Sequence, residues 1–147
     1  MMVKESVLMF EDILNGIREA TGEFDKREVL SLNPLILAYI GDAVYEMFVR
    51  TAVIISQPES SVHKMHVKTT GFVKAHAQFE ILKRIFPNLT EDEVNIVRRG
   101  RNSKSGFVPK NADVVEYRMA TGFEALIGYL YLIQDNLSFS YPTHLRH

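Results

Sequence analysis

The stretch from Pro34 to about Ile55 is apolar on nearly every side of a helix, and it constrains the fold more than any other part of the sequence. A helix start is predicted there, because Asn33 can cap free amides and proline suits the first helical turn. A helix that is apolar all round must be surrounded by other helices or contact a second subunit. Gly41 in its interior costs about 1 kcal/mol relative to Ala, which predicts that another group approaches this backbone closely.

The other segments also follow helical spacing, and none alternates convincingly as a strand. The predicted helices are Ser6–Thr21 ending at Gly22, Pro34–Ile55, Val62–Phe86 with a break near Gly71, a short helix from a capping box at Thr90 to about Gly100, and a last helix from about Asn111 to Asp135. We therefore predict an all-α fold with one domain over residues 1–147. Residues 1–30 form an N-terminal helical extension in this scheme, and residues 138–147 a tail.

The composition restricts the class of protein. A chain of 147 residues with 46% apolar and 24% charged residues is typical of one soluble globular domain. The absence of cysteine excludes disulfides, thiolate catalysis and cysteine zinc sites, and fits a reducing cytoplasm. The apolar run contains Asp42 and Glu46, which makes it a poor membrane span. We predict a cytoplasmic protein that does not contact a membrane.

Two acidic residues lie on helix faces that ought to be apolar, Asp42 within residues 32–50 and Glu124 within residues 117–132. A buried carboxylate costs several kcal/mol unless a cation or hydrogen bonds compensate it. Neither acid has a basic residue three or four positions away. Two such acids, far apart in sequence, suggest one shared magnesium site, because Mg²⁺ needs only one or two protein carboxylates when substrate phosphate completes its shell. The spacing fits equally well an acid that caps a helix or pairs with a distant arginine.

The neighbouring acids fit structural roles better. Glu46 lies four residues before Arg50, which predicts an ordinary ion pair along the helix. Asp113 and Glu116 lie near the predicted start of the last helix, where negative charge is favoured by the helix dipole.

Basic residues gather in two stretches that lack acids, one between Val94 and Ala112 and one before Glu80. Glycine and small polar residues in the first stretch let backbone amides approach an anion, so a phosphate backbone can lie along it. A solvated surface is the alternative for both stretches. The candidate contact residues are Arg98, Arg99, Arg101, Asn102, Lys104, Lys110, His66 and Lys68.

Several motifs resemble those of a known family. IGDAVYE (Ile40 to Glu46) and FEALIGYLYL (Phe123 to Leu132) are similar to the two catalytic motifs of ribonuclease III domains. The resemblance is closer to the Mini-III ribonucleases, which consist of that domain alone. It extends to LAYIGDA at 37–43, RRGRNSKSG at 98–106, PKNADV at 109–114 and YRMATGFEAL at 117–126, in order along the chain.

The resemblance implies a homodimeric, all-α ribonuclease III-type domain that cuts double-stranded RNA with Mg²⁺ or Mn²⁺ and leaves 5′-phosphate ends. It also implies that Asp42 and Glu124 are the catalytic, metal-binding acids, with Thr121 as a further candidate through a metal-bound water. Ala38 and Thr121 stand where larger ribonuclease III enzymes have two further acids, so fewer direct ligands are expected. The implied role is maturation of large-subunit (23S) ribosomal RNA precursor ends, with a ribosomal protein as stimulator.

Two other functions remain compatible with the residues. One is a catalytically weak double-stranded-RNA-binding module, which the two missing acids motivate. The other is an unrelated all-α interaction protein whose apolar second helix is a dimer seam.

Overall fold

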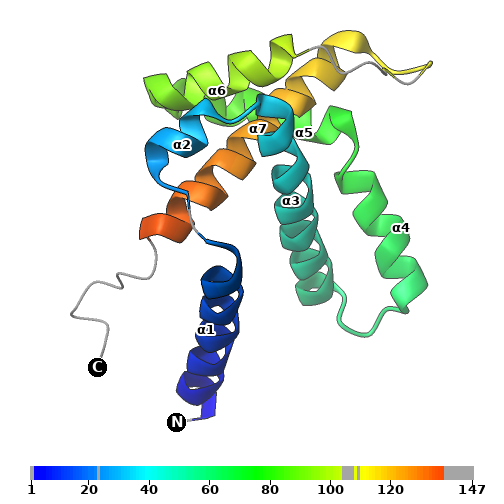
Figure 1. Cartoon of the computed structure of the whole chain (residues 1–147). Helices are drawn as coiled ribbons and strands as arrows, with labels where there is room; N and C mark the ends of the chain where they lie inside the picture. Colours follow the sequence, from blue (N-terminus) through cyan, green and yellow to red (C-terminus); the bar gives the residue numbers. More distant parts are fainter. Residues whose placement is uncertain (1, 23, 104–107, 109, 138–147) are drawn as a thin grey trace.

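The computed structural model describes residues 2–22, 24–103, 108 and 110–137, and every regular element within these ranges is a helix (Figure 1). The elements are α1 (Met2–Thr21), α2 (Lys26–Ser31), α3 (Pro34–Ser56), α4 (Val62–Phe72), α5 (Ala75–Ile85), the short 3₁₀ helix η1 (Phe86–Asn88), α6 (Glu91–Asn102) and α7 (Val114–Leu137). The predicted all-α class is confirmed. Among the described residues, no helix is both long and apolar enough to cross a membrane.

Helix α7 lies at the centre of the domain and packs against α2, α3, α5 and α6 (Figure 1). Its buried side chains belong to two apolar clusters. The first combines Val29, Leu37, Ala38 and Ile96 with Ala125 and Tyr129, and the second combines Tyr45, Leu82 and Val97 with Phe123 and Leu126. Four helices from both halves of the chain therefore share a core around α7.

The backbones of α3 and α7 touch where the two helices cross. A Cβ atom added to Gly41 would lie 1.7 Å from the carbonyl oxygen of Glu124, and one added to Gly128 would lie 1.9 Å from the carbonyl oxygen of Leu37. Only glycine allows this approach. The predicted close contact at Gly41 is confirmed, and the neighbouring group is the main chain of α7.

Glycine residues also allow α6 to approach the main chain of α7 closely. A Cβ at Gly100 would lie 2.8 Å from the Cα of Gly122, and one at Gly122 would lie 2.6 Å from the carbonyl oxygen of Val97. The C-terminal turns of α6 are thereby held against the part of α7 that precedes Glu124.

Most predicted helix ends are confirmed. The side chain of Asn33 accepts a hydrogen bond from the Leu35 amide at 2.9 Å. Thr90 forms the predicted capping box, accepting from the Glu93 amide while its own amide donates to the Glu93 carboxylate. The break predicted near Gly71 occurs just after it, at residues 73–74 between α4 and α5.

The N-terminal part of the chain differs from the prediction in one respect. The predicted helices leave residues 22–33 without one, but α2 begins at Lys26, because Asp25 caps it by accepting a hydrogen bond from the Glu28 amide at 2.8 Å. Val29 on α2 is fully buried in the first apolar cluster. Helix α1 stands apart from the other helices, with Phe10 among its exposed apolar residues (Figure 1).

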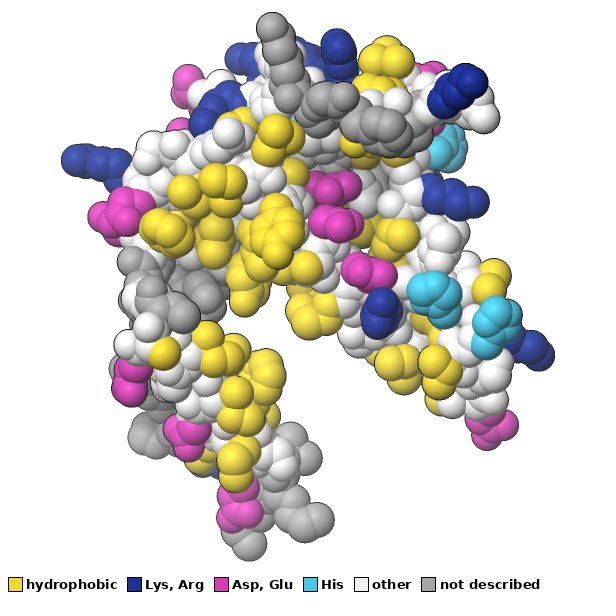
Figure 2. Space-filling model, turned by 45° about the vertical axis from the view of Figure 1, so that its right-hand side comes forward, with side chains coloured by type: hydrophobic (Ala, Val, Ile, Leu, Met, Phe, Trp, Pro, Cys, Tyr) yellow, Lys and Arg dark blue, Asp and Glu magenta, His cyan; other side chains and the backbone are white. Residues whose placement is uncertain are grey.

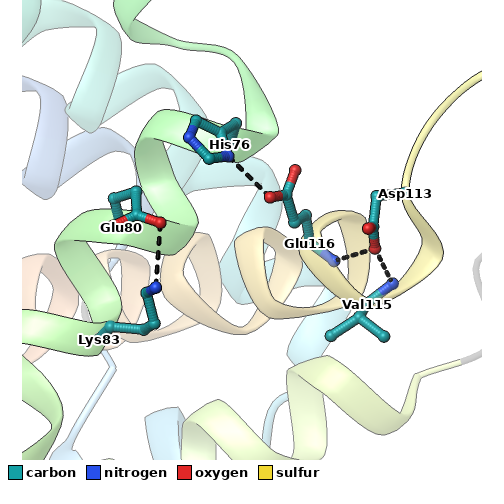
Figure 3. A network of polar contacts seen from close by, with 6 residues as sticks. All are labelled: His76, Glu80, Lys83, Asp113, Val115 and Glu116. Carbon is teal, nitrogen blue, oxygen red and sulfur yellow. Dashed lines mark hydrogen bonds and ion pairs between the residues drawn. The ribbon is translucent and has the colours of Figure 1, made fainter.

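The N-terminal end of α7 is fixed by polar contacts (Figure 3). The Asp113 carboxylate accepts hydrogen bonds from the amides of Val115 at 2.9 Å and Glu116 at 3.1 Å, which caps the helix. The Glu116 carboxylate contacts Nδ1 of His76 on α5 at 2.7 Å, and this hydrogen bond raises the pKa of the imidazole. Asp113 and Glu116 therefore have the structural roles predicted for them.

We expect Gly41→Ala to destabilise the domain by about 3 kcal/mol or more, because the added methyl group overlaps the main chain of α7. Urea unfolding would measure the change. Gly71→Ala is the matched control, since a Cβ there meets nothing within 4 Å. It should leave the stability unchanged or raise it by about 0.5–1 kcal/mol. Equal stability of the two variants would contradict the close contact between α3 and α7.

Candidate active site

The crossing of α3 and α7 brings the two predicted acids together. Asp42 directly follows Gly41, and the Glu124 carbonyl group is the one that Gly41 meets. The Asp42 charge contributes to the raised pKa of Glu124, so the two side chains act on one another. Figure 2 shows acidic side chains gathered near the middle of one face, with Lys and Arg side chains above them and further Lys, Arg and His side chains to the lower right.

The two carboxylates differ in their surroundings. Glu124 is half-buried, and this burial, with the Asp42 charge second, raises its pKa from 4.5 to about 7, while a hydrogen bond from Gln78 opposes the shift. Asp42 is exposed rather than enclosed in the core as its helix face suggested. Partial burial and then the nearby Glu46 charge still raise the pKa of Asp42. A negative charge on both groups is therefore unfavourable without a cation.

In the part of the chain that the structure describes, neither Asp42 nor Glu124 forms an ion pair with a lysine or arginine. This argues against the alternative in which each acid pairs with a distant arginine. Glu46 does form its predicted ion pair, with Arg50 at 3.1 Å along α3. Glu46 is thus neutralised by Arg50, whereas Asp42 on α3 and Glu124 on α7 are neighbouring acids that no described lysine or arginine neutralises.

Two neighbouring carboxylates whose pKa values are both raised, that of Glu124 in part by the Asp42 charge, fit a hard divalent cation. The described residues contain no group of three or more His, Asp or Glu side chains arranged to hold a metal. Asp42 and Glu124 would therefore be the direct protein ligands, and water or substrate oxygens would complete the shell, as Mg²⁺ allows. The Thr121 hydroxyl donates to the Tyr117 carbonyl at 3.1 Å, so it can only accept a hydrogen bond from a metal-bound water.

Gln78 is a site residue that the sequence reasoning missed. It lies on α5, is 1% exposed, and hydrogen-bonds to the Glu124 carboxylate. The signal was present in the sequence, because Gln78 shares a helix face with Leu82 and Ile85. A polar residue on an apolar face is the same feature that drew attention to the two acids.

The basic stretch predicted around residues 98–110 is partly helical. Arg98, Arg101 and Asn102 occupy the last turns of α6 and are exposed, and Lys110 is exposed in the turn before α7. The Arg101 Nε donates to the Asn102 side chain at 3.2 Å. Lys104 lies outside the described residues.

Arg99 has a structural contact that its neighbours lack. Its guanidinium donates two hydrogen bonds to main-chain carbonyl groups at the end of α2, at 2.7 Å to Leu30 in the helix and 2.9 Å to Leu32, which caps it. These bonds hold the end of α2 against α6. Changing Arg99 would therefore disturb the fold as well as any phosphate contact, so Arg101 is the better position for testing nucleic-acid binding.

His66 and Lys68 lie on α4, a different element from the other candidate contact residues. His66 is exposed and Lys68 is half-buried. The predicted contact residues thus divide between α4 and the region from the end of α6 to the start of α7.

Comparisons with known proteins agree with this arrangement. Residues 35–135 match the family model described as "Ribonuclease III domain". A protein named Mini-ribonuclease 3 from Clostridium tetani is 51% identical over 114 residues, which cover 78% of this chain and 76% of that protein. A Mini-ribonuclease 3 from Thermoanaerobacter sp. is 52% identical over 122 residues, covering 83% and 85%. The crystal structure of a Fusobacterium nucleatum protein superposes with a TM-score of 0.64 at 30% identity, covering 74% of this chain and 86% of that one.

We expect Glu124→Gln to be more stable than the wild type at about pH 8 without metal, and by a smaller margin at about pH 5. The Glu124 pKa is about 7 in the folded state against an ordinary value of 4.5. The folded protein therefore keeps a proton that the unfolded chain loses, and wild-type stability falls as the pH rises through this window. At about 1.4 kcal/mol per pKa unit, the gain above pH 7 is up to about 3 kcal/mol.

Urea unfolding of both proteins at the two pH values would measure this difference. Glu59→Gln, at an exposed position between α3 and α4, is the control and should show no pH-dependent gain. A Glu124→Gln variant that is less stable than the wild type at both pH values would show that the carboxylate stabilises the fold.

Proposed function

Since this chain belongs to the ribonuclease III family, we propose that it is a metal-dependent endoribonuclease that cleaves double-stranded RNA. The observation that carries the proposal is the pair of unneutralised carboxylates at the crossing of α3 and α7. Such a pair is costly for the fold and suited to a divalent cation. Basic residues on α4 and α6 supply the positive charge that a polyanionic substrate requires.

Asp42 and Glu124 would hold Mg²⁺, for which Mn²⁺ can substitute. The bound ion would supply Lewis acidity, lowering the pKa of an attacking water and neutralising charge at the scissile phosphate. Glu124 must be deprotonated to act as a ligand, and a cation favours that state against the effects of burial and of Asp42. The products would carry 5′-phosphate and 3′-hydroxyl ends.

The exposed basic residues would contact phosphate and 2′-hydroxyl groups of an A-form duplex. Binding of this kind recognises shape rather than sequence. Arg98, Arg101 and Asn102 on α6 would contact one part of the duplex, and His66 and Lys68 on α4 another. Arg99 would contribute by fixing the end of α2 to α6.

We further propose a homodimer, in which each protomer supplies one catalytic centre. The support is a row of exposed apolar residues along one side of α3, spaced at about one or two helical turns. The row includes Ile36, Tyr39, Met47 and Ile54. An exposed apolar row of this length is typical of a helix that packs against a second protein surface.

The cellular role proposed is maturation of large-subunit ribosomal RNA precursor ends in the cytoplasm, with a ribosomal protein as stimulator. This part rests on the resemblance to Mini-III ribonucleases. A second function, a catalytically weak module that binds double-stranded RNA, is favoured by one observation. Ala38 and Thr121 occupy positions where larger family members have acids, which leaves two carboxylates for the metal.

We expect Glu124→Gln to abolish cleavage of a long double-stranded RNA in Mg²⁺, with a loss of about a thousandfold or more. Its affinity for the duplex should remain close to that of the wild type. Cleavage is measured by gel electrophoresis and binding by filter retention in Ca²⁺. The control Glu59→Gln should cut at the wild-type rate. If the wild type binds the duplex but does not cut in Mg²⁺ or Mn²⁺, the weak binding module replaces the nuclease.

We expect Arg101→Glu to weaken binding of the duplex by about tenfold and to reduce the salt dependence of binding, while the rate of cleavage at saturating RNA changes little. The control is Arg84→Glu, which makes the same charge reversal at an exposed position of α5 outside both basic stretches. If both variants lose the same affinity for the duplex, the change in net charge explains the loss. The end of α6 then does not contact the RNA.

A further inference from the structure

Gln78 is the buried polar side chain that the proposed mechanism does not yet use. Among the described residues, its Oε1 is the buried side-chain oxygen or nitrogen that lacks a hydrogen-bond partner. Buried polar atoms in folded proteins are nearly always paired, so an exception calls for an explanation. The residue is 1% exposed and packs on the side of α5 that faces α7.

The amide nitrogen of Gln78 has two acceptors within its reach. Nε2 donates to the main-chain carbonyl oxygen of Val73 at 3.2 Å, and the side chain also lies against the Glu124 carboxylate, whose pKa it lowers. A primary amide has two N–H groups, which is sufficient for both contacts. Gln78 therefore connects the turn between α4 and α5 with the acid on α7.

Packing alone does not account for a glutamine at this position. A methionine has nearly the same length and shape, and it would fill the space without an unpaired oxygen. The amide oxygen is a cost to the fold, whereas the amide nitrogen contacts a predicted metal ligand. An apolar side chain could reproduce neither the hydrogen bond to the Val73 carbonyl group nor the contact with Glu124, and of these two the contact with Glu124 lies at the active site.

We propose that Gln78 is a positioning residue of the active site, which anchors the Glu124 carboxylate to the Val73 carbonyl group and holds it in the orientation that binds the metal. The inference rests on the proposed function, because it concerns the same site. Residues that orient metal ligands through hydrogen bonds change metal affinity or activity by about tenfold to a hundredfold when they are replaced.

The turn that anchors Gln78 is itself held from α3. The Tyr45 hydroxyl donates to the main-chain carbonyl oxygen of Phe72 at 3.0 Å. Phe72 and Val73 are adjacent, so one turn receives a hydrogen bond from α3 and another from α5. Because only the Gln78 bond continues to Glu124, Tyr45 offers a matched control that loosens the same turn without touching the carboxylate.

The test is Gln78→Met, with Mn²⁺ binding measured by water-proton relaxation in the absence of RNA and cleavage measured separately in Mg²⁺. We expect the Mn²⁺ dissociation constant to rise about tenfold or more and kcat to fall by a similar factor. The KM for duplex RNA should stay within about twofold. The Tm should change little, because removal of the unpaired amide oxygen offsets loss of the hydrogen bond to Val73. Wild-type Mn²⁺ affinity and kcat in Gln78→Met would overturn the proposal.

Tyr45→Phe should bind Mn²⁺ within about twofold of the wild type. If it weakens Mn²⁺ binding as much as Gln78→Met does, mobility of the turn explains the effect and the positioning role is wrong. If Gln78→Met does not fold, Gln78→Asn carries the same test, since it remains polar but is one methylene group too short to reach. A folded Asn variant with wild-type Mn²⁺ affinity would overturn the proposal.

The wild type separates this inference from the proposed function. A wild-type protein that binds no Mn²⁺ and cuts no RNA would reject the nuclease itself, and Gln78 with it. A wild type that does both, beside an unaffected Gln78→Met variant, would reject the positioning role alone.

Discussion

The main-chain contact between α3 and α7 is the constraint on which the rest of the structure depends. Gly41 and Gly128 let the two helices meet with no side chain between them, and the acids flank this contact. The separation of Asp42 and Glu124 is therefore set by the two backbones. Such a crossing deforms little, because helices in contact resist compression and their carbonyl groups cannot move independently. The site gains its geometry from the stiffest part of the domain rather than from a loop.

Much of this arrangement could be predicted because its signals are local. Helical spacing, caps and breakers act within a few residues, so the helix predictions agree with the structure to within a few residues at each end, and α2 is the α-helix that they missed. An acid on an apolar helix face is also visible without knowledge of its neighbours, which is why Asp42 and Glu124 were found. Gly41 belongs to the same class, since a glycine inside a helix carries a cost that needs a reason.

The remaining features depend on partners that are distant in the sequence. Arg99 looks like one more member of a basic cluster, and only the fold shows that Leu30 and Leu32 offer it two carbonyl groups. The exposure of Asp42 likewise depends on which neighbours cover its side of α3. Gln78 carried a visible signal, a polar residue on an apolar face, but a neutral side chain attracts less attention than a charged one because its burial costs less.

The central position of α7 also determines how the domain unfolds. The residues that follow Glu124 include Ala125 and Leu126, which are almost fully buried, and four other helices cover α7. In hydrogen exchange, the amides of such a segment exchange only when the whole domain unfolds. Ligand binding at Glu124 is therefore coupled to the global equilibrium, and an ion bound there would slow the slowest-exchanging amides of every helix that packs on α7.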